Sequence, residues 1–314
     1  MDEVRDRTSA TPRVTVVIPT NRAGRFLPEA LDSVAAQTYC SYEVIVAANS
    51  TADVPALRDI VDRYPKTRLV YQSTTGPVLS RNLGTALAHG EYIAFLDDDD
   101  VWHPDRLRLQ VAQLDLQPEA ILCYAAGWTI DHTGATISTD WLPTGVAAED
   151  LLCGRVDIPR IVTMLFRRRE LIRIGGFHPS FRFAEDDELI LRALQFGEVT
   201  SVPEALVGYR RHEDNVTGAD VERRRLSSRR VIALQRWGAE SWDDPEWEAA
   251  MAENDEHFRR RTADHQASDA LSSLKRGELI VGVTTLRDAV LASPRRAVGD
   301  VAARVRDKLS AGSG

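Results

Sequence analysis

Four apolar runs alternate with helical segments along the first third of the chain, and this alternation constrains the fold more than any other feature. The runs are "VTVVIP" (14–19), "YEVIVAA" (42–48), "RLVYQ" (68–72) and "EYIAFL" (91–96). Runs that are apolar on successive positions are typical of strands buried on both faces. Strands that alternate with helices predict an α/β fold with a doubly wound, mostly parallel sheet flanked by helices.

Three polar segments follow these strands, at the edge where ligands bind to such a sheet. They are "PTNR" (19–22), "AANS" (47–50) and "DDDD" (97–100). A charge run is usually a solvated turn. Carboxylates behind a buried strand, however, lose hydration and repel each other unless a cation neutralises them. Mg²⁺ and Mn²⁺ prefer carboxylate oxygen and often bind substrate phosphates as well, so the run 97–100 predicts a divalent metal site.

The pattern changes from about residue 121. The segment "EDDELILRALQFG" predicts an amphipathic helix with an acidic first turn, and the chain beyond about residue 220 is helical and charged. The domain organisation that we expect has these parts: a flexible N-terminus (1–12), a domain (13–218) with two halves (13–120 and 121–218), and a helical C-terminal extension (219–314) that includes a helical hairpin (268–294).

Composition argues against several classes of function. The net charge of −8 argues against an extended nucleic-acid surface, which would need a basic face. No apolar run approaches the ~18 to 20 residues of a membrane span, and the polar start "MDEVRDRTSATPR" does not have the pattern of a signal peptide. We therefore expect a soluble protein without a membrane span, with a cytoplasmic location. Only three of the 39 basic residues are lysines, which suggests a GC-rich bacterial genome.

Five motifs follow one another between about residues 12 and 215. They are "VTVVIPTNRAGRFLPEALDSVAAQTY", "YEVIVAANST", "LSRNLGTALAHGEYIAFLDDDDVWHPDRL", "IGGFHPSFRFAEDDELILRALQFG" and "YRRHEDNVT". In this order and spacing the sequence resembles the family 2 glycosyltransferases of the GT-A fold. The resemblance implies an inverting enzyme that uses Mn²⁺ or Mg²⁺ and moves a sugar from a nucleoside-diphosphate sugar to an acceptor hydroxyl. UDP is the nucleotide we favour, with dTDP and GDP open.

The resemblance also assigns roles to the acidic run. Asp99 corresponds to the metal ligand of an Asp-x-Asp motif, and Asp97 or Asp98 to the residue that reaches the ribose or a metal-bound water. His212 in "YRRHEDN" corresponds to a histidine that completes the metal site or touches the diphosphate. For Asp100 we expect a structural role, either at the start of the next helix or in orienting the turn.

On the acceptor side, a hydroxyl needs a base within hydrogen-bond reach. Asp186 matches the position of the family's catalytic base, and Glu185 precedes it. The simpler alternative is that both are favourable first-turn residues of a helix. Arg81 in "SRNLG" corresponds to an arginine near the nucleotide, where it would counter the phosphates or position the acidic loop.

The nucleoside is expected at the first two strand ends. Pro19, Thr20 and Asn21 should contact it, partly through backbone groups. Asn49 stands where relatives commonly have an aspartate that reads the base. An amide can hydrogen-bond a pyrimidine edge as donor or acceptor, so binding is compatible with this difference, but the choice of nucleotide is open.

Other functions fit the sequence less well. "FLDDDDV" also matches the haloacid-dehalogenase phosphatases, but no lysine lies between Lys66 and Lys275 to hold a phosphoryl group. A sugar-phosphate nucleotidyltransferase would need a glycine-rich first loop, and a non-catalytic nucleotide-sugar-binding homologue would not need the intact acids. The acceptor is open: a glycan, a lipid-linked glycan, a natural product or a peptide. The C-terminal helices could cover the acceptor side, form a homodimer, or bind a peptide or carrier.

Overall fold

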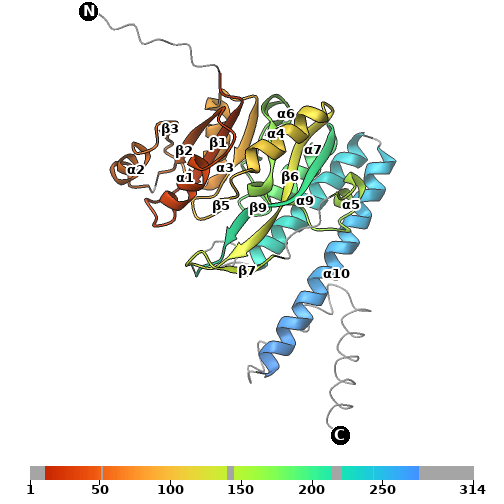
Figure 1. The fold of residues 1–314 in the computed structure, drawn as a ribbon. Coiled ribbons are helices and arrows are strands. Elements are labelled where there is room, and N and C mark those ends of the chain that lie inside the picture. The colour runs from red at the N-terminus through yellow and green to blue at the C-terminus, as the bar shows by residue number, and fades with distance from the viewer. Residues whose placement is uncertain (1–10, 51, 140–144, 214–220, 243, 276–314) are drawn as a thin grey trace, which may run out of the picture. The chain divides into compact units, whose positions relative to one another are not determined.

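The computed structural model describes five stretches of the chain, residues 11–50, 52–139, 145–213, 221–242 and 244–275 (Figure 1). Within them the chain forms two compact units. The first contains the described residues up to Ala148 together with Val156–Ser228, and the second contains Glu149–Arg155 and the described residues from Arg229 onward. Most of the hairpin predicted at 268–294, and most of the predicted flexible N-terminus, lie outside the described residues.

One sheet forms the centre of the first unit. Its strands within the described residues are β1 (Val14–Thr20), β2 (Tyr42–Ala48), β3 (Thr67–Tyr71), β4 (Tyr92–Phe95), β5 (Val101–Trp102), β6 (Ala120–Ile130), β7 (Thr136–Ser138), β8 (Leu165–Arg167) and β9 (Glu198–Arg210). The order across the sheet is β3-β2-β1-β4-β8-β6-β9-β5, and β7 pairs with β6. Parallel pairs join β1 to β2 and β4, β2 to β3, and β6 to β9. The antiparallel pairs of the described strands are equal in number but much shorter, so most paired positions are parallel and the sheet is mostly parallel, as predicted.

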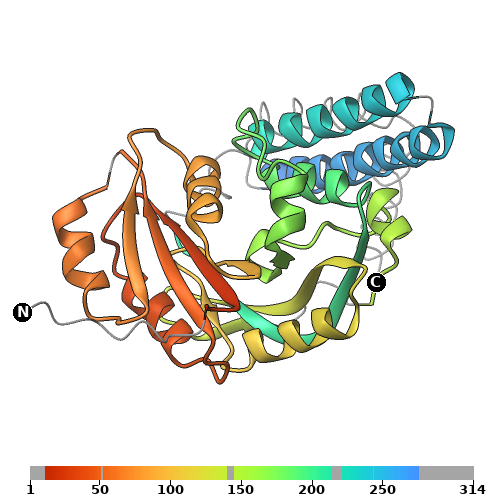
Figure 2. The same ribbon diagram turned by 90° about the horizontal axis from the view of Figure 1, so that it is seen from above.

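Helices lie on both sides of the parallel strands (Figure 2). The helices of the described residues are α1 (Leu27–Ala35), α2 (Val54–Val61), α3 (Pro77–Leu87), α4 (Arg106–Leu116), α5 (Ala148–Leu152), α6 (Arg168–Arg173), α7 (Glu185–Ala193), α9 (Val221–Trp242) and α10 (Pro245–Lys275), with a 3₁₀ turn η1 (Ile161–Thr163). Every residue of β1 is buried, which confirms the prediction that the run 14–19 is a strand buried on both faces. Apolar faces on both sides of the strands leave their carboxyl ends as the open edge for ligands.

Close helix–strand packing depends on glycine at one point in particular. A Cβ added to Gly84 in α3 would lie 2.3 Å from Val17 Cγ1 in β1. Only a residue without a side chain lets α3 approach the sheet this closely. The approach fixes the position of Arg81, one turn earlier in α3, relative to the strand ends.

Two short strands that the sequence did not predict shape the site. β8 is antiparallel to both β4 and β6. β5 follows the four aspartates directly and pairs antiparallel with β9, with Val101 opposite Gly208. This pairing brings the acidic loop beside the end of β9, where the "YRRH" motif begins.

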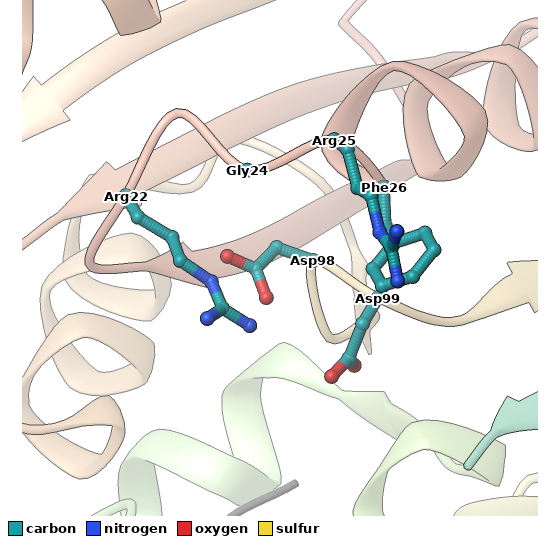
Figure 3. Close-up of a pocket in the computed structure, with 6 residues that line it drawn as sticks. All are labelled: Arg22, Gly24, Arg25, Phe26, Asp98 and Asp99. Atoms are coloured by element: carbon teal, nitrogen blue, oxygen red, sulfur yellow. The ribbon is translucent and has the colours of Figure 1, made fainter. Parts of the chain in front are cut away.

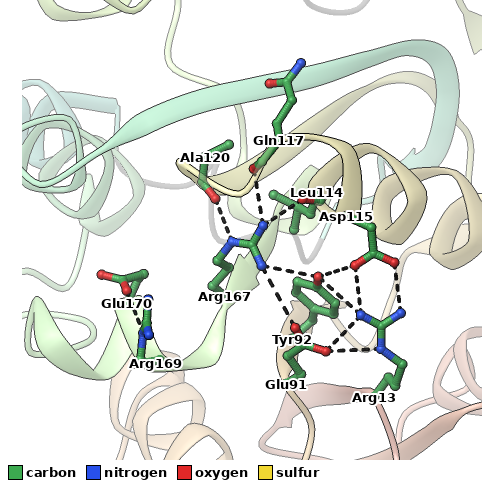
Figure 4. A network of polar contacts seen from close by, with 10 residues as sticks. All are labelled: Arg13, Glu91, Tyr92, Leu114, Asp115, Gln117, Ala120, Arg167, Arg169 and Glu170. Carbon is green, nitrogen blue, oxygen red and sulfur yellow. Dashed lines mark hydrogen bonds and ion pairs between the residues drawn. The ribbon is translucent and has the colours of Figure 1, made fainter.

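A polar network ties the amino end of the sheet together (Figure 4). Arg13, just before β1, forms ion pairs of 2.8 Å with both Glu91 and Asp115, and the Tyr92 hydroxyl donates to Asp115 at 2.6 Å. Arg167 donates to the carbonyls of Leu114 and Gln117 at the end of α4 and to the carbonyl of Ala120 at the start of β6. These residues lie at the amino end of β4, so we assign them to stability.

The second unit is helical in its described part. Arg155 forms ion pairs with Glu149, Asp150 and Glu253 at 2.9, 3.1 and 2.7 Å, and Asn254 of α10 donates to the Leu152 carbonyl. These contacts hold the segment 149–155 against α10. Among the helices that the structure describes, none is long and apolar enough to cross a membrane.

Candidate active site

The acidic loop between β4 and β5 places its first three carboxylates at the carboxyl edge of the sheet. The Thr20 hydroxyl, at the end of β1, donates to Asp98 Oδ2. Asp99 Oδ2 lies 3.0 Å from His212 Nε2, and the His212 side chain is 4% exposed. Burial raises the pKa of Asp98 to about 7, and burial together with the Asp97 charge raises the pKa of Asp99. These carboxylates are thus desolvated groups that a cation would stabilise.

Asp100 has a different environment from its neighbours. Its side chain is fully buried, and its Oδ1 accepts a hydrogen bond of 2.8 Å from the backbone nitrogen of Arg210. Helix α4 begins only at Arg106, with Asp105 at its N-cap position. Asp100 therefore orients the turn, the second of its two predicted structural roles, and does not cap the helix.

Arg81 joins the acidic loop to the helix that carries the predicted base. Its Nη2 lies 2.7 Å from Asp97 Oδ1, and its Nη1 lies 3.0 Å from Glu185 Oε1. The guanidinium is 4% exposed. Burial alone would lower the pKa of Arg81, but the charges of Asp97 and Glu185 raise it above its ordinary value. Through these two ion pairs Arg81 links the acidic loop to the first turn of α7.

Asp186 lies at the start of α7, beside this ion-pair bridge. Its Oδ2 accepts from the backbone nitrogen of Ile161 at 3.0 Å, and its Oδ1 is buried without a hydrogen-bond partner among the described residues. Burial and the Glu185 charge raise the pKa of Asp186 to about 7, against the opposing charge of Arg81. The residue before the helix, Ala184, has φ of 59°, a left-handed conformation that is uncommon outside glycine and occurs at functional sites.

A pocket of about 180 Å³ opens between the β1–α1 loop and the acidic loop. Arg22, Arg25 and Phe26 line it on one side, and Asp98 and Asp99 on the other (Figure 3). Figure 3 shows Arg22 extending toward Asp98 and Arg25 lying against Phe26, its guanidinium 4.5 Å from the ring centroid. The pocket thus combines cationic and anionic side chains, as a site for a metal and an anionic ligand requires.

The residues predicted to contact the nucleoside lie next to this pocket. Thr20 ends β1, and its carbonyl accepts from the backbone nitrogen of Asn49 at 3.1 Å. Asn49 is 6% exposed, and Asn21 is exposed. Pro19 pairs with Ala47 inside the sheet and is buried. The structure therefore brings Thr20 and Asn49 together at the carboxyl edge, while Pro19 sits one residue inside the strand.

The donor set at Asp99 fits a divalent ion that is shared with a ligand. A carboxylate and an imidazole 3.0 Å apart are both groups that bind Mn²⁺. Within the part of the chain that the structure describes, no group of three or more His, Cys, Asp or Glu side chains is placed to hold a metal ion. Ions of this class are often held by one or two protein ligands and complete their coordination with substrate phosphates and water.

Several residues of the site were not predicted. Arg25 and Phe26 of the pocket follow the segment 19–22 closely, and this position was the available signal for them. Arg22 lies within that segment, which was expected at the ligand edge, but no role was predicted for it. The contact of Asp186 with Ile161 had no signal in the sequence, because the partner is a backbone nitrogen.

Known proteins of the same fold confirm the architecture. TarS from S. aureus in complex with UDP-GlcNAc matches with a TM-score of 0.62 at 17% identity, over 91% of this chain and 82% of that one. The mannosyltransferase PcManGT from Pyrobaculum calidifontis, in complex with GDP-Man and Mn²⁺, matches with a TM-score of 0.60 at 17% identity, over 96% and 81%. The likeness shows that the chain has the GT-A fold, as predicted.

The family follows from the sequence comparison. The glycosyl transferase family 2 model matches residues 15–176, more than half of the chain, and the chain therefore belongs to this family. Relatives include the uncharacterized glycosyltransferase YibD of Escherichia coli K12, 32% identical over 145 residues that cover 44% of this chain and 42% of YibD. The O-antigen biosynthesis protein RfbC of Myxococcus xanthus is 31% identical over 195 residues, 59% of this chain and 15% of RfbC. The chain spans less than half the length of both relatives.

Proposed function

We propose that this chain is a metal-dependent inverting glycosyltransferase that moves a sugar from a nucleoside-diphosphate sugar to an acceptor hydroxyl. The bridge through Arg81 carries the proposal, because it places the acidic loop and the Glu185–Asp186 pair at one site. Fold neighbours that bind UDP-GlcNAc, or GDP-Man with Mn²⁺, support the same class of donor. UDP sugars are the donors we favour, with dTDP and GDP sugars as the alternatives.

Asp99 and His212 would hold the metal, with Asp97 and Asp98 beside it. A bound Mn²⁺ or Mg²⁺ would supply positive charge where the leaving diphosphate gathers negative charge. The side chains of Arg22 and Arg25 face the same pocket and would add to the positive charge around the diphosphate. Thr20, Asn21 and Asn49 would contact the nucleoside at the adjoining strand ends.

Asp186 is the base of this proposal. A carboxylate with a pKa near 7 is a stronger base than an ordinary aspartate and is still largely ionised just above neutral pH. Its unpartnered Oδ1 is the atom that would take the proton from the acceptor hydroxyl as that oxygen attacks the anomeric carbon. Glu185, held by Arg81, would act by raising the pKa of Asp186 and not by touching the acceptor.

Thermal unfolding with nucleotides tests the donor side. UDP, dTDP and GDP are each added with Mn²⁺ or with EDTA, since a ligand that binds the native state raises the melting temperature. We expect one nucleotide to give the largest rise, and we expect EDTA to remove most of it. The Asp99→Asn variant should lose the Mn²⁺-dependent part, whereas Asp59→Asn, an exposed carboxylate on α2, should retain it. Equal rises with Mn²⁺ and EDTA would refute the metal dependence.

A further inference from the structure

Arg210, the last residue of β9, is nearly inaccessible, with a side chain that is 1% exposed. Its backbone is fixed by pairing with Ile130 of the neighbouring strand. A buried guanidinium is costly unless each of its nitrogens finds an acceptor. The acceptors that bind the Arg210 nitrogens therefore indicate which part of the fold this arginine stabilises.

Two of the hydrogen bonds of Arg210 go to successive residues of the acidic loop. The backbone nitrogen donates to Asp100 Oδ1 at 2.8 Å, and the side-chain Nε donates to the Asp99 carbonyl oxygen at 2.8 Å. The first bond anchors the end of the loop, and the second fixes the peptide plane that follows Asp99. Together they restrict the directions in which the Asp99 carboxylate can point.

The other side of the guanidinium is held from separate parts of the fold. Nη2 pairs with Glu29 of α1 at 2.6 Å, and Nη1 donates to the Asp131 carbonyl at 3.3 Å. The guanidinium also lies 4.3 Å from the centroid of the Phe26 ring, and the centroid of the His212 ring lies 5.1 Å from the same ring. The same arginine thus contacts the backbone of Asp99 and the ring that packs against His212.

We infer that Arg210 is a positioning residue for the Asp99–His212 pair, which it holds in the geometry that binds a divalent cation. The inference rests on the proposed function, since it assumes that this pair binds the metal. Lysine could not replace the arginine fully, because one ammonium group does not reach three acceptors in the directions of a planar guanidinium. Residues that orient metal ligands typically change affinity about 10- to 100-fold when they are removed.

The test is a Mn²⁺ titration followed by EPR, without acceptor and both without and with UDP, on the full chain and its variants. Arg210→Met should weaken Mn²⁺ binding about 10- to 100-fold, and Arg210→Lys less. Arg167→Met is the matched control: it removes an arginine that holds three carbonyls at the amino end of the sheet. The control should lower the melting temperature and leave the Mn²⁺ affinity within about twofold.

Each result separates the inference from the proposed function. A parent chain that binds no Mn²⁺, either alone or with UDP present, overturns the metal site and the inference with it. A parent that binds, with Arg210→Met folded and of equal affinity, overturns the inference alone. If Arg210→Met does not fold, Glu29→Gln replaces it, because Glu29 is 51% exposed and this change weakens the Nη2 ion pair while keeping the arginine that bonds to Asp99 and Asp100. That variant should weaken Mn²⁺ binding, and unchanged affinity in both Glu29→Gln and Arg210→Lys overturns the inference.

Discussion

Replacing Asp186 with asparagine should slow sugar transfer strongly and yet stabilise the protein at alkaline pH. The folded-state pKa of Asp186 is raised to about 7 by burial and by the Glu185 charge. A carboxyl whose pKa is raised on folding contributes stability that is full below its unfolded pKa near 4. That contribution is lost as the pH rises through about 7, because the buried group must then ionise. Asparagine keeps the shape and never ionises.

The magnitude follows from the pKa and the contacts. Each unit of difference between the folded and unfolded pKa changes the free energy of unfolding by about 1.4 kcal/mol. A folded pKa near 7 and an unfolded pKa near 4 therefore cost the parent about 4 kcal/mol of stability at pH 8. The amide oxygen can still accept from Ile161, but the amide nitrogen would occupy the unpartnered Oδ1 position, at a cost of about 1 to 3 kcal/mol. We therefore expect Asp186→Asn to be more stable than the parent by about 1 to 3 kcal/mol at pH 8, and not more stable at pH 5.

The assay is thermal unfolding of parent and variant at pH 5 and pH 8, beside the rate of sugar transfer. A domain of this size gains about 2 to 4 °C for each kcal/mol. Loss of the base should slow transfer about 10²- to 10⁴-fold. Asp187→Asn, in the same first turn of α7, is the control and should not gain stability at pH 8, because its carboxylate complements the helix dipole. A variant that is less stable than the parent at pH 8 as well as at pH 5 would refute the reasoning.

Three further changes test other parts of the site and fold. Arg81→Met leaves two carboxylates without their ion pairs and should cost about 3 to 5 kcal/mol of stability. It should also shift the pH profile of sugar transfer to higher pH, because the Arg81 charge lowers the pKa of Asp186. An unshifted profile would contradict this. Gly90→Ala places a Cβ 2.5 Å from the Thr15 backbone nitrogen and should lower the melting temperature without changing Mn²⁺ affinity, as a titration of the folded variant would show. Asn49→Asp should change the order of nucleotide affinities in the thermal-shift panel. An unchanged order would mean that the nucleobase does not contact residue 49.

The parallel half of the sheet could be predicted from the sequence because its central strands β1, β2 and β4 are largely buried, whereas β3 at the edge is only partly buried. Buried strands leave unbroken apolar runs, and the runs at 14–19 and 42–48 coincide with β1 and β2 to within one residue. The polar segments after them then mark the ligand edge by topology alone. The short strands β5 and β8 left no comparable pattern, because two or three residues are too few to show a period.

The site could be predicted only where residue chemistry or the family resemblance gave a signal. Carboxylate chemistry indicated the run 97–100, and the resemblance selected Asp99, His212 and Asp186. Neither distinguishes Arg210 within "YRRH". A signal was present: Arg210 stands two residues before His212, and alternate residues of an extended chain face the same side. The partner of Asp186 is a backbone group of Ile161, which no residue type reveals.

The most direct measurement is the anomalous scattering of Mn²⁺ in crystals grown with UDP or the nucleotide that the thermal-shift panel selects. We expect one Mn²⁺ ion within coordination distance of Asp99 and His212, with oxygens of the diphosphate on the same ion and Asp186 facing the position of the sugar. An ordered nucleotide in the pocket with no ion on Asp99, or with its phosphates away from that residue, would contradict the proposed metal-dependent transfer.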